Sequence, residues 1–241
     1  MDAIRKELGR IGGALSFLTI VPVPGKKVLE GSSAYYPLAG WLIGGVLYGV
    51  WTACHGLAYP VRAFIALAVW ELLSRGLHVD ALADTADAFM AGGDRARILR
   101  IMDDSHTGAF GIMAIGLLLI GKFALLTTLR YNAARDALVC AAVMGRYSLT
   151  LLCCLFRPAK DVGLGSMIIS SSGARELIIA TAIGIVPVAV LFRLHAAYAV
   201  SGLAVSLLVA LYARRKIGGL TGDVLGASLE LTELASLFSF L

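Results

Sequence analysis

The sequence predicts an all-α integral membrane protein, a polytopic bundle of about six or seven transmembrane helices that forms one domain over residues 1–241. Composition is the first indication, because 59% of the residues are hydrophobic and 15% are charged, whereas a soluble domain carries about 25% charged residues. The second is a mean hydropathy of +0.83. The third is that long apolar runs recur without the alternation typical of strands. We therefore expect helices packed together in lipid.

The first element is the segment 1–30, which carries basic residues followed by a short apolar run. It lacks the cleavage site of a signal peptide and is short for a span, so we expect a retained amphipathic or partly inserted helix. The next elements are apolar runs of about the 20 residues that a span needs. They cover 37–58, 61–79, 108–129, 134–156, 176–194, 196–213 and 225–241. Gly40 and Gly44 in the first run have the spacing that lets two helices approach closely.

Positive charge predicts the orientation of these helices. Fifteen of the 21 lysine and arginine residues fall on the side of the N-terminus, and four fall on the opposite side. Because such residues concentrate in cytoplasmic loops, we expect a cytoplasmic N-terminus. The net charge of +5 does not indicate nucleic acid, since no lysine- and arginine-rich block is present. The same orientation brings most acids near helix ends to the cytoplasmic face, where we expect the active site.

The stretch HVDALADTADAF gathers three of these acids at the end of an apolar run. Asp80, Asp84 and Asp87 are spaced i, i+4, i+7, so they share one face of a helix. Carboxylates are the hard oxygen ligands that Mg²⁺ prefers, and Mg²⁺ leaves room for waters and phosphate oxygens. The pattern favours a metal site for a phosphate substrate over an acidic helix end in solvent.

Two further stretches carry polar residues near predicted helix starts. In MDDSHTGAFG, Ser105 is a candidate cap for the following helix, whose first amides could face an anion. Asp104 and His106 flank it, and an ordinary capped loop is an equal alternative. In GGLTGDVLGASLELTE, Thr221 or Asp223 can cap the last helix, and Glu230 shares the face of Asp223.

Charged residues inside apolar runs need partners. An arginine at the bilayer centre costs about 2.5–3.5 kcal/mol, so Arg146 is expected to pair with an acid or a phosphate. For Lys122 a structural ion pair is at least as strong an interpretation. Arg157, before Pro158 and a glycine-containing turn, could hold phosphate oxygens or simply form the turn. His78 stands beside the aspartates, as a base, a ligand or neither.

These stretches together resemble the cobalamin synthase family, also called adenosylcobinamide-GDP ribazoletransferase. The resemblance rests on GLHVDALADTADAF, MDDSHTGAFG and GGLTGDVLGASLELTE, in that order, and on FLTIVPVP and FRPAKDVGLG. The chain departs from the family where Ala81 and Ala88 replace usual glycines, where Asp103 replaces a basic residue, and where His106 and Ile20 replace arginine-like residues.

The resemblance implies a late step of cobalamin biosynthesis in the cytoplasmic membrane of a bacterium or archaeon. The enzyme would move the adenosylcobinamide phosphoryl group from adenosylcobinamide-GDP to α-ribazole or its 5′-phosphate, releasing GMP, with Mg²⁺ as cofactor. The expected residues are listed by role: Asp80, Asp84, Asp87 and His78 as catalytic; Asp80, Asp84, Asp87 and Asp223 as metal ligands; and Asp104, Ser105, His106, Arg146, Arg157, Thr221 and Glu230 as substrate-binding. The lipid bilayer is the expected surrounding. A homo-oligomer, or association with other cobalamin-assembly enzymes, stays open.

Two alternatives compete with this interpretation. A CDP-alcohol phosphotransferase also uses spaced aspartates and Mg²⁺, but its usual arginine is absent from DALADTAD. An ion-coupled transporter would place its acids near the bilayer midplane, whereas most acids here are predicted at span ends.

Overall fold

The computed structural model describes residues 2–25, 27–130 and 133–240. Within these ranges the chain forms helices and turns without any strand, and one isolated bridge pairs Pro158 with Leu220. The prediction of an all-α protein is confirmed. The elements in chain order are α1 (Asp2–Leu18), the 3₁₀ helix η1 (Ser32–Tyr35), α2 (Tyr36–Ala53), α3 (Tyr59–Leu73), α4 (Leu77–Ala91), α5 (Arg95–Met102), α6 (Ala109–Thr128), α7 (Ala134–Leu155), α8 (Leu164–Ser170), α9 (Ala174–Ile183), α10 (Ile185–Phe192), α11 (Leu194–Ile217) and α12 (Gly222–Phe238).

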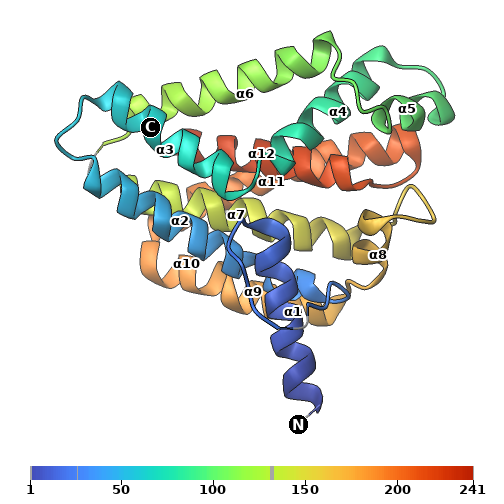
Figure 1. Cartoon of the computed structure of the whole chain (residues 1–241), viewed down its shortest axis with the longest axis horizontal. Coiled ribbons are helices and arrows are strands. Elements are labelled where there is room, and N and C mark those ends of the chain that lie inside the picture. Colours follow the sequence, from blue (N-terminus) through green and yellow to red (C-terminus); the bar gives the residue numbers. More distant parts are fainter. Residues whose placement is uncertain (1, 26, 131–132, 241) are drawn as a thin grey trace.

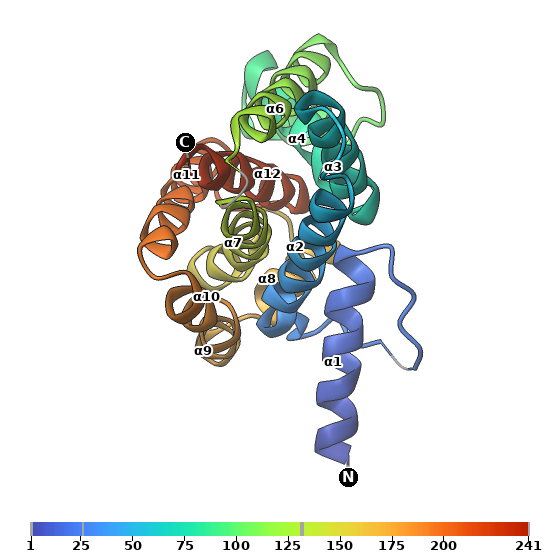
Figure 2. The same cartoon turned by 90° about the vertical axis from the view of Figure 1, so that its left-hand side faces the viewer.

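Helix α7 lies at the centre of the bundle, between α2 and α12 (Figures 1 and 2). Nearly all of its side chains are buried. The contact with α2 depends on Gly40 and Gly44, since a Cβ atom would lie 2.6 Å from the Cα of Val143 at the first and 2.7 Å from the Cα of Val139 at the second. The packing role predicted for these two glycines is therefore confirmed.

The predicted span 61–79 is wrong as a single helix. Helix α3 ends at Leu73 and α4 begins at Leu77. Between them Arg75 and Gly76 take left-handed backbone conformations, with φ of 59° and 64°, which an α-helix cannot contain. The break frees α4 to turn away from α3 and to pack against α6 and α12. All three aspartates of the first acidic stretch lie on α4.

Three helical segments in the described part of the chain are long and apolar enough to cross a membrane. They are Ala109–Thr128, Ala134–Leu155 and Ala174–Phe192. Helices α3 and α12 have 15 and 17 residues, fewer than the roughly 20 that a span needs. The helical membrane character is thus supported, and the number of six or seven spans stays a prediction.

Candidate active site

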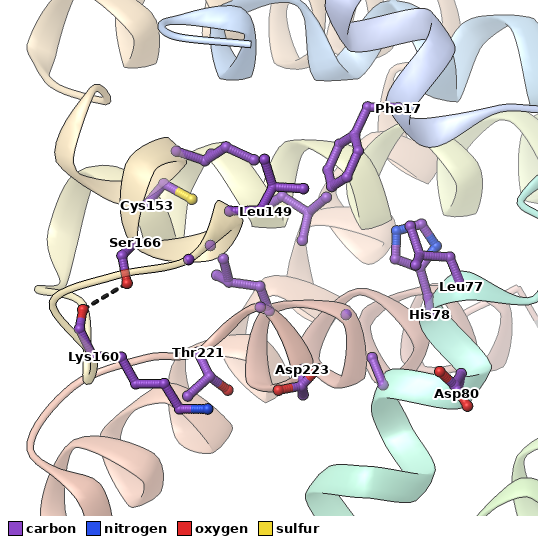
Figure 3. A pocket seen from close by; sticks show the side chains of 18 of the residues that line it. Phe17, Leu77, His78, Asp80, Leu149, Cys153, Lys160, Ser166, Thr221 and Asp223 are labelled. Atoms are coloured by element: carbon purple, nitrogen blue, oxygen red, sulfur yellow. Dashed lines mark hydrogen bonds between the residues drawn. The ribbon is translucent and has the colours of Figure 1, made fainter. Parts of the chain in front are cut away.

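A cavity of about 560 Å³ lies between the start of α4, the start of α12 and the segment that joins α7 to α8 (Figure 3). Helix α4 contributes His78 and Asp80, and α12 contributes Asp223 with its N-cap Thr221. Lys160 comes from the segment between α7 and α8. Four residues of the predicted site therefore line one cavity although they come from two distant stretches of the chain.

Two loops on one wall of the cavity are joined by backbone hydrogen bonds. The amide of Leu220 donates to the carbonyl of Arg157 (2.9 Å), and the amide of Ala159 donates to the carbonyl of Leu220 (2.8 Å). A Cβ atom on Gly219 would lie 2.5 Å from the Arg157 carbonyl oxygen. Glycine at this position is needed for the close approach of the two loops.

The carboxylates beside the cavity repel one another. Asp84, one turn beyond Asp80 on α4, is half-buried. Burial, followed by repulsion from Asp80, Asp223 and Asp87, raises the pKa of Asp84 to about 6. Burial also raises the pKa of the Asp223 carboxyl. Such a concentration of like charge is stabilised by a cation.

Asp87 has a partner that the sequence did not predict. Its two carboxylate oxygens accept hydrogen bonds from the amides of Gly108 (2.7 Å) and Gly111 (2.9 Å), at the start of α6. Added Cβ atoms at both glycines would collide with this carboxylate. Asp87 thus caps α6. Ser105 is the predicted cap, but it is an exposed residue that lies before the helix. The N-cap position itself is occupied by Gly108, which provides no side-chain cap.

Arg146 and Glu230, expected to bind substrate, lie instead inside the bundle and do not line the cavity. The Arg146 guanidinium donates to Glu233. Glu230 accepts from the Lys122 ammonium at 2.5 Å. The interpretation of Lys122 as part of a structural ion pair is confirmed. For Arg146 the predicted partner is an acid or a phosphate, and the structure shows an acid. A buried charge is stable only when it is paired, and each of these side chains has a partner of opposite charge in the protein.

The remaining expected substrate-binding residues lie outside the cavity lining. Asp104 and His106 are exposed, and the His106 ring nitrogen Nδ1 lies 2.7 Å from the Asp104 carboxylate. The Arg157 side chain is exposed, while its carbonyl oxygen joins the two loops.

Lys160 is the residue that the sequence reasoning missed. Its Nζ lies 2.5 Å from the Asp103 carboxylate, and Figure 3 shows the side chain extending toward Thr221 and Asp223. The Lys160 carbonyl accepts from the Ser166 hydroxyl at 2.6 Å, which holds this loop in place. No periodicity could have identified Lys160, because it lies in an irregular segment; its position three residues after Arg157 in a family-like stretch was the available signal.

The donor set fits a cation that is shared with substrate. Among the described residues no three histidine, cysteine, aspartate or glutamate side chains form a ready-made metal cage. Mg²⁺ is commonly held by only one or two carboxylates plus waters and phosphate oxygens. Asp80 and Asp223 line the cavity, and Asp84 lies one turn beyond Asp80 on α4, so the site offers carboxylates of this kind and number.

Comparison with known proteins identifies the family. Residues 10–241 match the cobalamin-5-phosphate synthase family. The chain belongs to this family. It is 32% identical to the adenosylcobinamide-GDP ribazoletransferase of Caldanaerobacter subterraneus, over 98% of both chains. It is 36% identical to the proteins of that name from Chlorobaculum parvum, over 93% of this chain and 92% of the relative, and from Pseudomonas syringae, over 94% and 96%. No solved structure matches the chain.

Two departures from the cobalamin-5-phosphate synthase pattern have a structural explanation. The Ala81 methyl group on α4 faces Gly226 on α12, and a Cβ atom added to Gly226 would lie only 2.5 Å from it. The crossing of the two helices therefore has room for one methyl group. Ala88 is fully buried and belongs to an apolar cluster that includes residues of α5 and α11. Both alanines fill space in the packed bundle.

Proposed function

We propose that this chain is an adenosylcobinamide-GDP ribazoletransferase. It transfers the adenosylcobinamide phosphoryl group from adenosylcobinamide-GDP to α-ribazole or α-ribazole 5′-phosphate. The products are adenosylcobalamin or its 5′-phosphate, and GMP. The observation that carries the proposal is the family match over residues 10–241. It favours this activity over a CDP-alcohol phosphotransferase and over an ion-coupled transporter, and the acidic cavity with its lysine is chemically suited to a pyrophosphate.

In this reaction a ribose hydroxyl oxygen forms a bond to the phosphorus on the cobinamide side, and the bond from that phosphorus to the GMP oxygen breaks. Phosphoryl transfer depends mostly on positioning and charge neutralisation. The hydroxyl proton passes to a base, for which we favour an aspartate of the cavity. His78 is the second candidate, because its ring lines the same cavity and no hydrogen bond engages its Nδ1.

Asp80, Asp84 and Asp223 would hold Mg²⁺ in this proposal. When bound, the ion would neutralise phosphate charge during the transfer. Asp87 is left out of the set, because both of its oxygens already accept hydrogen bonds from the start of α6. Its role in the site is to position α4 relative to α6.

Lys160 supplies the positive charge for the pyrophosphate. It is the cation among the residues that line the cavity. Where the family usually has a basic residue, this chain has Asp103, and Asp103 is the partner of Lys160. We infer that a lysine from the α7–α8 segment replaces the missing basic residue, and that it exchanges Asp103 for a substrate phosphate when substrate binds.

The proposed orientation puts the N-terminus and the cavity on the cytoplasmic side of the cytoplasmic membrane, as the distribution of lysine and arginine indicates. Reporter fusions would test it. A fusion within 92–94, between α4 and α5, should report a cytoplasmic location, and one at 54–58, between α2 and α3, should report the opposite side. The reverse result would remove this topology.

The activity is tested by release of GMP from adenosylcobinamide-GDP by the purified protein. We expect release to require an acceptor, either α-ribazole or its 5′-phosphate, and to stop when Mg²⁺ is chelated and resume when it is returned. Release of CMP from a CDP-alcohol would favour the first alternative. Ion-coupled uptake into vesicles without any release of nucleotide would favour the second.

A further inference from the structure

Helix α1 differs from the rest of the bundle in direction. It runs across the long helices α6, α7 and α12, and its N-terminal half projects from the body (Figures 1 and 2). Since α6 and α7 are long and apolar enough to cross a membrane, a helix that runs across them lies along the membrane plane. Amphipathic helices that lie in this way bind at the lipid–water interface.

The projecting half of α1 has an exposed apolar stripe beside positive charge. Ile4 and Leu8 are 67% and 62% exposed. Their i, i+4 spacing continues into Ile11 and Leu15, which are half-buried on the same face. Exposed Arg5 lies next to this stripe, and exposed Lys6 lies farther round the helix. Large exposed apolar side chains on a held helix indicate a surface that something covers.

A basic hollow lies beside the same half of the helix. It is a cavity of about 1150 Å³ between α1 and the segment 24–30. Its charged lining residues are Arg5, Lys6, Lys27 and Glu30, so cations outnumber acids three to one among the described residues. Lys26, one of the fifteen basic residues predicted on the side of the N-terminus, lies outside the described residues. The charge and the apolar rim complement an anionic headgroup with its acyl chains.

The projection of α1 is held by specific contacts. The Glu7 carboxylate accepts hydrogen bonds from Tyr35 (2.7 Å), Arg10 (2.7 Å) and Arg175 (2.8 Å). The amide of Val28 donates to the carbonyl of Gly9 at 2.9 Å. These bonds fix the direction of α1, and its last turn places Phe17 in the lining of the catalytic cavity.

We propose that the surface formed by Ile4, Arg5, Lys6, Leu8 and Lys27 binds anionic phospholipid. Ile4 and Leu8 enter the boundary between headgroups and acyl chains, and the three cations contact headgroup phosphates. Cations near a membrane surface each add to the attraction for anionic lipid. Because α1 also carries Phe17, the same binding holds that wall of the catalytic cavity in position.

The test titrates phosphatidylglycerol, with phosphatidylcholine as reference, into the full-length protein in detergent and measures bound lipid by native mass spectrometry. The triple variant Arg5→Gln, Lys6→Gln, Lys27→Gln should lose phosphatidylglycerol affinity by more than about tenfold. The matched control is Arg214→Gln, Arg215→Gln, Lys216→Gln, which removes three exposed cations from the end of α11. It should lose less than about twofold if the site on α1 dominates.

Equal affinity in the wild type and the α1 variant would overturn the proposal, and so would an equal loss in the control. A second readout is hydrogen exchange of the α1 amides in nanodiscs. Phosphatidylglycerol should slow it, and the Ile4→Ser, Leu8→Ser variant should abolish the slowing while retaining its helical content. If protection follows protein concentration rather than lipid, a second copy of the chain covers the surface and the proposal is wrong. No readout requires turnover, so the result is independent of the proposed function.

Discussion

The Lys122 ammonium lies 2.5 Å from a Glu230 carboxylate oxygen, and neither side chain is accessible to solvent. The same ammonium also donates to Glu233 (2.7 Å) and to Glu71 (3.0 Å). With Arg146 bound to Glu233, two cations and three carboxylates form one network inside the bundle. It joins α3, α6, α7 and α12, and it explains how an apolar core accommodates so many charges.

Replacing Lys122 alone should destabilise the protein strongly. Lys122→Met leaves buried carboxylates without their cation, which typically costs about 3–5 kcal/mol. The double variant Lys122→Met, Glu230→Gln returns the network to its original net charge and should recover much of that loss. Thermal unfolding in detergent, followed by circular dichroism, measures both. A wild-type unfolding temperature for the single variant would show that the network contributes little.

Asp87 should act on stability through the start of α6. Asp87→Asn keeps one acceptor oxygen and turns an NH₂ group toward a backbone amide, so we expect a loss of about 1–2 kcal/mol, as for other helix caps. Asp104→Asn is the control, since it changes an exposed acid and should stay within about 0.5 kcal/mol. Denaturant unfolding provides the comparison. If Asp87→Asn is fully stable and binds Mg²⁺ more weakly, Asp87 is a metal ligand after all.

Asp84 should matter for turnover and not for stability. Asp84→Asn removes a charge from the crowded carboxylates, so folding should be unharmed while GMP release falls by at least about 100-fold. Thr85→Ala is the neighbour control, because the Thr85 hydroxyl is buried without a hydrogen-bond partner and its loss breaks no bond. An equal fall in turnover at Thr85 would contradict the assignment of activity to one face of α4.

Lys160 should control affinity for the nucleotide substrate. Removing a charge-assisted contact, as in Lys160→Gln, should raise KM for adenosylcobinamide-GDP by about tenfold or more with a smaller effect on kcat. Arg157→Gln should change neither, because that side chain lies outside the cavity lining. Adding Asp103→Lys to Lys160→Gln returns a cation to the cavity and should restore part of the affinity. An unchanged KM in Lys160→Gln would contradict a role of Lys160 in substrate binding.

The crossing of α4 and α12 should tolerate one methyl group and not two. In Gly226→Ala the new Cβ atom would lie 2.5 Å from that of Ala81, and overpacking of this kind costs about 1–3 kcal/mol. Ala81→Gly in the same chain should relieve it. Gly222→Ala is the matched control at the start of α12, where an added Cβ atom meets nothing within 4 Å. The measure is the unfolding temperature of the four proteins, and no rescue by Ala81→Gly would contradict the packing account.

The sequence by itself determined the helical class, most helix positions and the segments that form the site. These follow from properties of consecutive residues: apolar length, glycine spacing and the family-like acidic stretches. Gly40 and Gly44 pack against α7 as their spacing predicts, and His78, Asp80, Thr221 and Asp223 meet at one cavity.

Only the tertiary structure decided which partner each charged side chain takes. The left-handed turn at Arg75 and Gly76 separates α3 from α4, and α4 then aims Asp87 at Gly108, 21 residues away. Arg146 meets Glu233 across 87 residues, and Lys122 meets Glu230 across 108. Periodicity shows which residues share a face of one helix, but the identity of the facing helix depends on packing of the whole chain. For a buried charge the facing helix determines whether the charge neutralises another side chain or binds substrate, because a buried charge is stable only when it is paired.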